Sequence, residues 1–191
     1  MKTLFIPALL AAIIIFSSCK KNNSAKSGSS IEGSYKFKYL TAATNSTVTD
    51  DQGEKDVSIS HYTTIGNQGT IVLDNSNLTA TGLGYSVDTL AYDYFYQDNV
   101  LQDSLSSPFT FTYPPTNSQT TYKLIGSDSI YFSGNTGSGG IISGGSGGRY
   151  ILNGSILTIT QNVLKDSTFS DAGVNYHSVE TAVASIVLEK Q

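Results

Sequence analysis

Large side chains recur at every second position along much of this chain, and this alternation restricts its fold more than any other feature. The pattern is clearest in residues 35–39, 57–65 and 109–113. A period of two places alternate side chains on one face of a β-strand. After residue 30, no segment keeps an apolar stripe at helical spacing over three turns. We therefore expect a domain built almost entirely of β-strands.

Turn-forming residues divide the chain at short intervals. Gly, Asn, Asp or Pro cluster between the apolar runs, at 66–69, 75–77, 114–115 and 126–128. The strongest signal is Asn153 followed by Gly154, because both residues accept the positive φ angles of a type I′ hairpin turn. The final run, 174–188, is long for one strand. We expect it to bend or cross between faces near 182–184 and to close the sheet or barrel.

The N-terminal segment has the layout of an export signal. Lys2 precedes an apolar run of thirteen residues, 4–16, and Ser17 and Ser18 separate this run from Cys19, the only cysteine. A membrane-spanning helix needs about 20 apolar residues, so this run is too short for a permanent span. A charged start, a short apolar run and small residues at its end are typical of a signal peptide.

The residues around the cysteine resemble the lipobox of bacterial lipoproteins. The motif Phe-Ser-Ser-Cys ends at Cys19 and departs from the usual pattern at Phe16, where leucine is commonest. The resemblance implies that residues 1–18 are a lipoprotein signal peptide and that Cys19 is lipidated, with palmitate among its acyl chains. Residues 19–30 would then be the lipidated cysteine and a flexible tether. Lys20 stands where some lipoproteins retained in the inner membrane carry aspartate, which favours the outer membrane.

Residues 31–191 have the length of a single domain and can bury a core. Without a second cysteine no disulfide can form, so packing and strand pairing must stabilise the domain outside the cytoplasm. The net charge is −4 at pH 7, and Arg149 is the only arginine. This balance argues against nucleic acid as a partner.

Three segments resemble parts of the lipocalin-like, calycin-type domains of small bacterial lipoproteins. Residues 31–37 look like the Gly-x-Trp opening of their first strand, with Tyr35 in place of tryptophan. Residues 148–159 look like their penultimate hairpin, and residues 182–189 like their closing strand. The resemblance implies a single antiparallel barrel of about eight or more strands. It also implies that a basic residue packs on the first aromatic ring, and Lys190 is the candidate. A two-sheet β-sandwich is the alternative.

The chain offers little of the chemistry that enzymes and metal sites need. Its two histidines, His61 and His177, lie near no Gly-x-Ser-x-Gly motif. Two histidines and one committed cysteine do not make a usual zinc site. Four aspartates recur every five residues, at Asp88, Asp93, Asp98 and Asp103. Because an odd spacing alternates between the faces of a strand, we interpret these as solvated turn residues. We expect no enzymatic activity, no metal and no cofactor.

Glycine dominates residues 134–148, where it occupies eight of fifteen positions. No lysine is present there to bind a phosphate, so the segment fits neither a P-loop nor a Rossmann fingerprint. We expect a mobile surface loop, with a lid over a pocket as the alternative.

Tyr92, Tyr94 and Tyr96 are the best candidates for ligand contact, because their spacing forms a ladder on one strand face. Such a ladder can stack on sugar rings or hold an apolar ligand, although cross-strand packing and a protein interface are alternatives. By parity, His61 and His177 each share a face with apolar residues, so both are expected to point inward. They would line one cavity, or else be satisfied histidines of the core or rim.

Two functional hypotheses follow for a protein anchored to the membrane through its N-terminal lipid. In the first, the domain is a non-enzymatic binding module for a small apolar or sugar-like ligand. In the second, it is a structural or accessory envelope lipoprotein that meets another envelope protein through exposed strands or aromatic residues.

Overall fold

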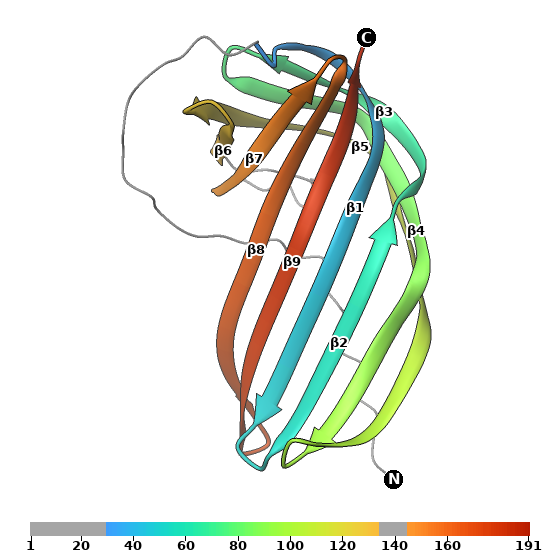
Figure 1. The fold of residues 1–191 in the computed structure, drawn as a ribbon, viewed down its shortest axis with the longest axis vertical. Helices are drawn as coiled ribbons and strands as arrows, with labels where there is room; N and C mark the ends of the chain where they lie inside the picture. Colours follow the sequence, from blue (N-terminus) through green and yellow to red (C-terminus); the bar gives the residue numbers. More distant parts are fainter. Residues whose placement is uncertain (1–29, 134–144) are drawn as a thin grey trace.

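The computed structural model describes residues 30–133 and 145–191 and shows one antiparallel sheet of nine strands in them (Figure 1). The strands are β1 (Gly33–Asp50), β2 (Glu54–Thr63), β3 (Ile65–Asp74), β4 (Asn77–Gln97), β5 (Val100–Ile125), β6 (Ser129–Ser133), β7 (Ser146–Asn153), β8 (Ile156–Asp171) and β9 (Val174–Lys190). The predicted signal peptide, Cys19 and most of the tether lie outside the described residues, as do residues 134–144 of the glycine-rich segment. Among the described residues, no helix has the length and apolar character that a membrane span requires.

The sheet closes on itself, because the first strand pairs with the last. The order β1-β3-β4-β5-β6-β7-β8-β9 returns to β1 through the β1–β9 pairing. β2 and β3 follow one another between β1 and β4, and each pairs with both of these strands. Thr64 joins β2 to β3 by donating its backbone N–H to Leu40 O over 2.9 Å and accepting the Leu40 N–H on its hydroxyl over 2.9 Å. The expected all-β barrel is thus confirmed. The sandwich alternative is wrong, since a single sheet holds all nine strands.

The core fills the closed part of this ring. Tyr35 and Phe37 of β1 begin it, and both are almost completely buried. Side chains from seven other strands complete it, including Ile71, Leu73, Ile130, Phe132, Leu157, Ile159, Ile186 and Leu188. Burying one such side chain contributes about 1.5–3 kcal/mol. This packing therefore stabilises the closed end of the molecule without a disulfide.

Lys190 lies over the first aromatic ring of the core, as the resemblance implied. Its ammonium nitrogen is 6.0 Å from the centroid of the Tyr35 ring and donates a hydrogen bond to Glu32 O over 3.0 Å. The Tyr35 hydroxyl donates to Ile31 O over 2.7 Å. Gly33 leaves room for this lysine, because a Cβ at position 33 would stand 2.8 Å from Lys190 Cε.

The other end of the sheet is open. β6 pairs with β5 only at residues 121–125, and β7 pairs with β8 only at 156–160. Among the described residues, 100–120 of β5 and 161–171 of β8 therefore have a strand partner on one side only. Figure 1 shows the long strands continuing past β6 and β7 to three turns at the bottom of the view. We call these two ends the closed end and the open end.

Two of the predicted turns are instead irregularities inside strands. Residues 66–69 belong to β3, where the register with β4 shifts on both sides of Gln68. Gly69 has a φ of 106°, and a Cβ on it would lie 2.7 Å from Gly82 O, so only glycine allows this approach of β3 to β4. Pro114 and Pro115 lie within β5, which can include them because one side of the strand has no partner there.

The hairpin predicted at Asn153 is confirmed, but its turn is displaced by one residue. Asn153 pairs with Ile156, so Gly154 and Ser155 form the turn, and Gly154 alone has a positive φ, 59°. Glycine first with an ordinary residue second is the pattern of a type II′ turn. With a turn at residues 153–154, Leu152 would lie opposite Ser155. In the observed register it lies opposite Leu157, so both leucines have an apolar partner.

The final strand closes the sheet as expected, but without crossing between faces. β9 pairs with β8 and with β1 in unbroken register through residues 182–184. The irregularity lies in β1 instead, where the register with β9 shifts between Phe37 and Tyr39.

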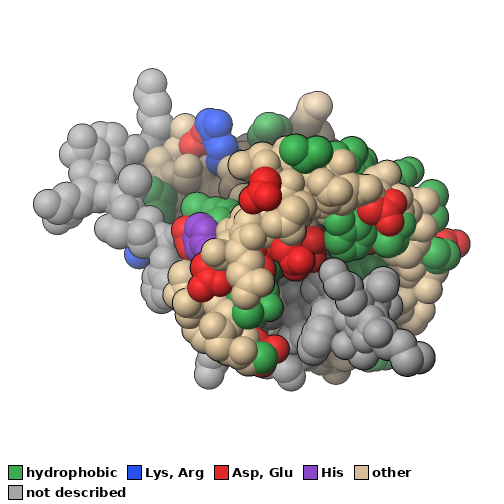
Figure 2. Space-filling model, turned by 90° about the horizontal axis from the view of Figure 1, so that it is seen from below, with side chains coloured by type: hydrophobic (Ala, Val, Ile, Leu, Met, Phe, Trp, Pro, Cys, Tyr) green, Lys and Arg blue, Asp and Glu red, His purple; other side chains and the backbone are tan. Residues whose placement is uncertain are grey.

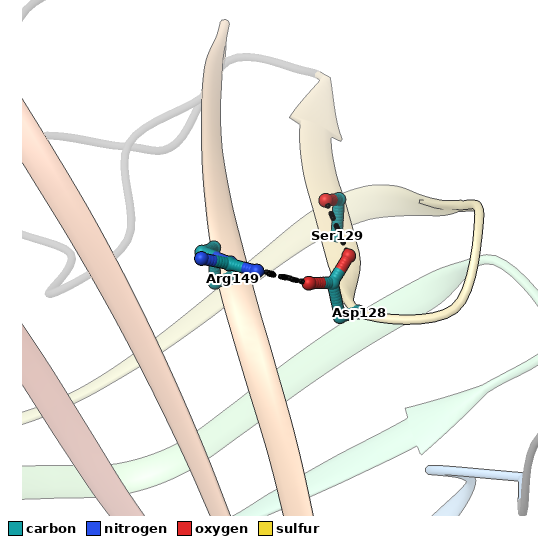
Figure 3. A network of polar contacts seen from close by, with 3 residues as sticks. All are labelled: Asp128, Ser129 and Arg149. Atoms are coloured by element: carbon teal, nitrogen blue, oxygen red, sulfur yellow. Dashed lines mark hydrogen bonds and ion pairs between the residues drawn. The ribbon is translucent and has the colours of Figure 1, made fainter.

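A charged group ties β6 to β7 at the closed end (Figure 3). Arg149 donates from Nη2 and Nε to Asp128 Oδ2 over 2.5 and 3.2 Å, and Ser129 donates to Asp128 Oδ1 over 3.1 Å. The Arg149 guanidinium holds the pKa of the Asp128 carboxyl below its usual range. Because both side chains are exposed, this pair orients the short strand more than it stabilises the fold.

Candidate functional site

A pocket of about 480 Å³ lies at the open end, where β1, β8 and β9 terminate together. Hydrogen bonds join the three turns of this end, from Asp51 N to Asn175 O over 3.1 Å and from Asp98 N to Gly53 O over 2.9 Å. Figure 2 looks onto this end. The pocket is lined by Thr49, Asp50, Asp51, Thr168, Phe169, Ser170, Asn175, Tyr176 and His177.

A pair of stacked aromatic rings forms the apolar part of the pocket lining. Phe169 of β8 and Tyr176 of β9 are direct partners in the sheet register. Their ring centroids lie 5.0 Å apart at an interplanar angle of 14°. The Phe169 side chain is 49% exposed, so the pair presents aromatic surface to solvent at a place where the sheet core has ended.

Carboxylate and amide groups surround these rings and are held in place by local hydrogen bonds. Asp50 Oδ1 accepts the backbone N–H of Gln52 over 2.9 Å and that of Glu54 over 2.8 Å, which fixes the β1–β2 turn. Asp51 Oδ2 accepts from Asn175 Nδ2 over 2.9 Å, and Ser170 Oγ donates to Asn175 Oδ1 over 2.7 Å. The polar rim is therefore preorganised by contacts between turns that are far apart in sequence.

His177 contributes the remaining ionisable group of the lining. Its Nε2 lies 2.8 Å from Asp166 Oδ1, and the two side chains are 50% and 63% exposed. Thr168 is the direct partner of His177 in β8, and Asp166 lies two residues before it on the same face of the strand. This contact orients the imidazole at the edge of the pocket.

The pocket is negatively charged. Asp50 and Asp51 line it, and neither lysine nor arginine does. Figure 2 shows acidic side chains gathered on this end of the molecule. Burial and the nearby Glu54, Asp50 and Asp93 raise the pKa of Asp56, one strand away on the same end. Such a field disfavours anionic ligands and suits neutral, hydroxyl-rich ones.

No metal centre is found at this or another place in the described ranges, since no three His, Cys, Asp or Glu side chains there come close enough to hold an ion. The interpretation of the four spaced aspartates as turn residues is confirmed for Asp98 and wrong for the other three. Asp98 occupies a turn, whereas Asp88, Asp93 and Asp103 lie within strands. Asp93 accepts a hydrogen bond from Ser58 on the inner face.

The structure places the predicted tyrosine ladder on the outer face of the sheet. Tyr92 pairs with Ile59 and Tyr94 with Val57, and these residues alternate with Ser60 and Ser58 of the inner face. Tyr92 is 45% exposed. Lys55 lies over the Tyr96 ring, 4.3 Å from its centroid. The ladder is therefore a half-exposed surface outside the barrel.

The expectation that both histidines point inward is wrong. Ala42 and Tyr62 face each other on the core side, so the neighbouring His61 lies on the outer face, opposite Ala43. His177 lies opposite Thr49 on that outer face. These two positions are six residues apart along β1, about 20 Å at the rise of a strand. The histidines therefore do not share a cavity, and only His177 lines the pocket.

A second aromatic group occupies the inner face where the closed part ends. Phe109, Phe111 and Tyr113 share a face as predicted, and they meet Tyr62 and Tyr85 with centroid separations of 5.3 to 6.4 Å. Burial is the main cause that raises the pKa of Tyr85 to about 12. These rings pack mainly against one another and against the core.

Sequence reasoning did not find most of the pocket residues. Asp50, Asp51, Asn175 and Ser170 resemble ordinary turn residues, and only the pairing of β1 with β9 brings them together. One sequence feature could have indicated the pocket. Phe169 and Tyr176 lie at equal distances before and after the Ala172–Gly173 turn, which predicts that they pair across the two strands.

The fold and pocket define a class of protein: an all-β domain whose single sheet is closed at one end and open at the other. No protein-family model matches the chain, and no curated protein matches it significantly. Among solved structures, the chain is similar to Ail, the attachment invasion locus protein of Yersinia pestis, with 8% identity and a TM-score of 0.21. That comparison covers 82% of this chain and 99% of that chain. At so low a TM-score, the likeness establishes neither a shared fold nor a shared function.

Proposed function

We propose that this protein is a lipid-anchored envelope protein whose domain is a non-enzymatic binding module for a small sugar-like ligand. The ligand occupies the pocket at the open end. The observation that carries this proposal is the stacked pair Phe169 and Tyr176 beside Asp50, Asp51 and Asn175 in one pocket.

The lining has the two kinds of surface that a neutral sugar needs. The C–H face of a sugar ring packs on an aromatic ring, as the exposed surface of Phe169 allows. Sugar hydroxyls donate to carboxylates such as Asp50 and Asp51, and these bonds are stronger because the acceptor is charged. The carboxylates already lie in fixed positions, so little ordering is needed on binding. The negative field disfavours phosphorylated or sulfated sugars.

The anchor rests on Cys19 and the segment before it. The lipobox-like motif supports lipidation, and Lys20 supports an outer-membrane location. The packing of Lys190 on Tyr35 supports a lipocalin-like ancestry for the domain. A non-enzymatic role is supported by the sequence, because neither histidine lies near a Gly-x-Ser-x-Gly motif.

Calorimetric titration of the full chain in detergent tests this proposal, with N-acetylglucosamine, maltose and cellobiose as the probes. We expect saturable binding of at least one probe with a Kd between about 1 μM and 1 mM. Tyr176→Ala should weaken that binding at least tenfold, because it removes half of the stacked pair. Tyr92→Ala is the matched control, since it removes an exposed tyrosine outside the pocket.

Two outcomes would contradict the proposal. The first is that none of the three sugars binds to a chain with a native circular dichroism spectrum. The second is that Tyr92→Ala abolishes binding while Tyr176→Ala leaves it unchanged, which would move the site to the outer face.

A second candidate function is that of an accessory protein that meets another envelope protein. The observation in its favour is the outer-face surface around Leu90 and Tyr92, each 45% exposed. A photo-crosslinking residue at position 92 tests it in intact envelopes, with one at position 39 as the control. A specific adduct from position 92 alone supports this role, and equal labelling from both positions opposes it.

A further inference from the structure

Among the described residues, the open end leaves two strand edges without a partner, and the two edges differ in composition. One is residues 100–120 of β5 and the other is residues 161–171 of β8. An unpaired edge presents a row of backbone N–H and C=O groups that another strand can pair with. Proteins usually protect such edges with proline, bulges or charged side chains, so an edge without proline whose charges complement those of a second copy indicates an interaction surface.

The β5 edge is protected by proline. Pro108, Pro114 and Pro115 all lie in its unpaired stretch, and they are the only prolines in the described ranges. Proline has no N–H and cannot donate to a neighbouring strand. Successive N–H groups of a strand point to opposite sides, so only one of the adjacent Pro114 and Pro115 removes a donor from this free edge. The missing donor still interrupts a regular ladder with an added strand.

The β8 edge has no proline and no glycine between residues 161 and 171. It carries two opposite charges on one face of the strand, Lys165 and Asp171, because they are separated by an even number of residues. Lys165 Nζ lies 3.3 Å from Glu180 Oε1 within the same chain, and the lysine side chain is 44% exposed. A lysine ammonium has three donors, so this contact leaves capacity for a second carboxylate.

We propose that the β8 edge pairs with the β8 edge of a second copy of this chain, antiparallel and centred on Thr168. In that register Lys165 of each copy lies opposite Asp171 of the other, on the same face. Asp166 lies opposite Ser170, so no two like charges face each other. Two Lys–Asp pairs related by the two-fold axis then favour this register over its neighbours.

The composition of the two edges also limits the assembly to two copies. A two-fold contact uses the same surface on both partners and closes on itself. Continued growth would need the β5 edge, which the prolines block. The paired sheets therefore form a dimer and not a fibre. Thr168, Phe169 and Ser170 of this edge also line the pocket, but the pairing uses backbone groups and does not require the proposed ligand.

Disulfide trapping in intact envelopes tests the register directly. Thr168→Cys places the new thiol opposite its own copy, at a separation suited to a disulfide. Non-reducing gels should show a covalent dimer at least tenfold more abundant than in Ser170→Cys, whose thiol would face Asp166. The proposal is overturned if Thr168→Cys stays monomeric, links to a different protein, or dimerises no more than Ser170→Cys.

A charge exchange separates contact between copies from effects within one chain. Lys165→Glu and Asp171→Lys, each added to Thr168→Cys, should lower the trapped dimer at least tenfold through like-charge opposition. The combined exchange of both charges should restore it to within about threefold. Since the exchange does not restore the pair between position 165 and Glu180, recovery can come only from the partner copy. Failure to recover in a chain with native circular dichroism would overturn the register.

Discussion

Tyr35 shows how one side chain can define a corner of this fold. It is fully buried, yet its hydroxyl is satisfied by Ile31 O and its ring lies beneath Lys190. These contacts join the residues before β1 to the end of β9. A single aromatic residue thus connects the two ends of the described chain.

We predict that Tyr35→Phe lowers the free energy of unfolding by about 1–3 kcal/mol. The substitution leaves the Ile31 carbonyl without its partner in a place that water does not reach, and an unsatisfied buried group costs that much. Tyr39→Phe is the control, because Tyr39 is 39% exposed and should change stability little. Urea unfolding of both variants measures the difference, and equal midpoints would contradict the role of the hydroxyl.

Asp56 predicts a dependence of stability on pH. Its pKa in the folded protein is raised above 3.8, chiefly by burial and then by Glu54, Asp50 and Asp93. As the pH rises from 3.8 to the raised value, the unfolded chain loses its proton first, so this group lowers stability through that window. Asp56→Asn should therefore raise the midpoint of thermal unfolding at pH 7 and change it little at pH 3. An equal shift at both pH values would show that charge is not the cause.

The contact of Lys190 with the first aromatic ring was predicted correctly, whereas the inward orientation of the histidines was not. The packing of Lys190 followed from a resemblance and was confirmed. Parity correctly placed His61 with Val57 and Ile59, but it does not say which face of a strand is inner. The register of β1 with β2 decides that, and it turns His61 outward.

Hairpin turns are the elements in which this chain departs most from ideal geometry. Asp98 and Asn99 have φ angles of 52° and 63°, which these residue types tolerate. The β8–β9 turn needs the same conformation, but there Ala172 has a φ of 48° before Gly173. Alanine in the left-handed region costs about 1 kcal/mol because its Cβ approaches the following carbonyl.

Ala172→Asn should accordingly raise the free energy of unfolding by about 1 kcal/mol, since it creates the Asn-Gly sequence that a type I′ turn favours. Asn99→Ala provides the reverse change in the β4–β5 turn and should lower stability by a similar amount. Chemical denaturation of both variants tests whether the free energy of unfolding rises in the first and falls in the second. A gain from both substitutions would contradict the turn assignment.

The elements themselves were largely predictable, because strands and most turns leave local patterns. Glycine and proline were the source of the errors. Gly69 interrupts β3 because β4 passes too close for a Cβ, and Pro114 and Pro115 continue β5 because no strand needs their N–H groups. In both cases the cause is the presence or absence of a neighbouring strand, which the local sequence does not reveal.

At the scale of the whole molecule, the position of the pocket follows from the uneven lengths of the strands. β6 and β7 are short, so the sheet closes at one end only, and the turns that line the pocket project beyond them. The sequence predicted a closed barrel but not its open end. The open end results from the short pairing of β6 and β7 with their neighbours, and the sequence does not reveal how far each strand is paired. The pocket was missed for the same reason.

The prolines of β5 give a prediction at this scale. Replacing Pro108, Pro114 and Pro115 together with threonine should restore the missing N–H groups and make the second edge available. We expect the triple variant to form assemblies larger than the parent chain, as measured by light scattering over a range of concentrations. Thr110→Ser in the same edge is the control. A triple variant no larger than the parent would show that the edge is blocked by something else.

The pairing of β1 with β9 has a further consequence, for the order of events during synthesis. Glu32 and Lys190, which contact each other in the closed ring, are 158 residues apart in the sequence. The ring has no means of closing before its last strand has been synthesised, and contacts this remote in sequence form slowly. Until β9 is in place, residues 39–50 of β1 lack their β9 partner, and this edge is open to chaperones.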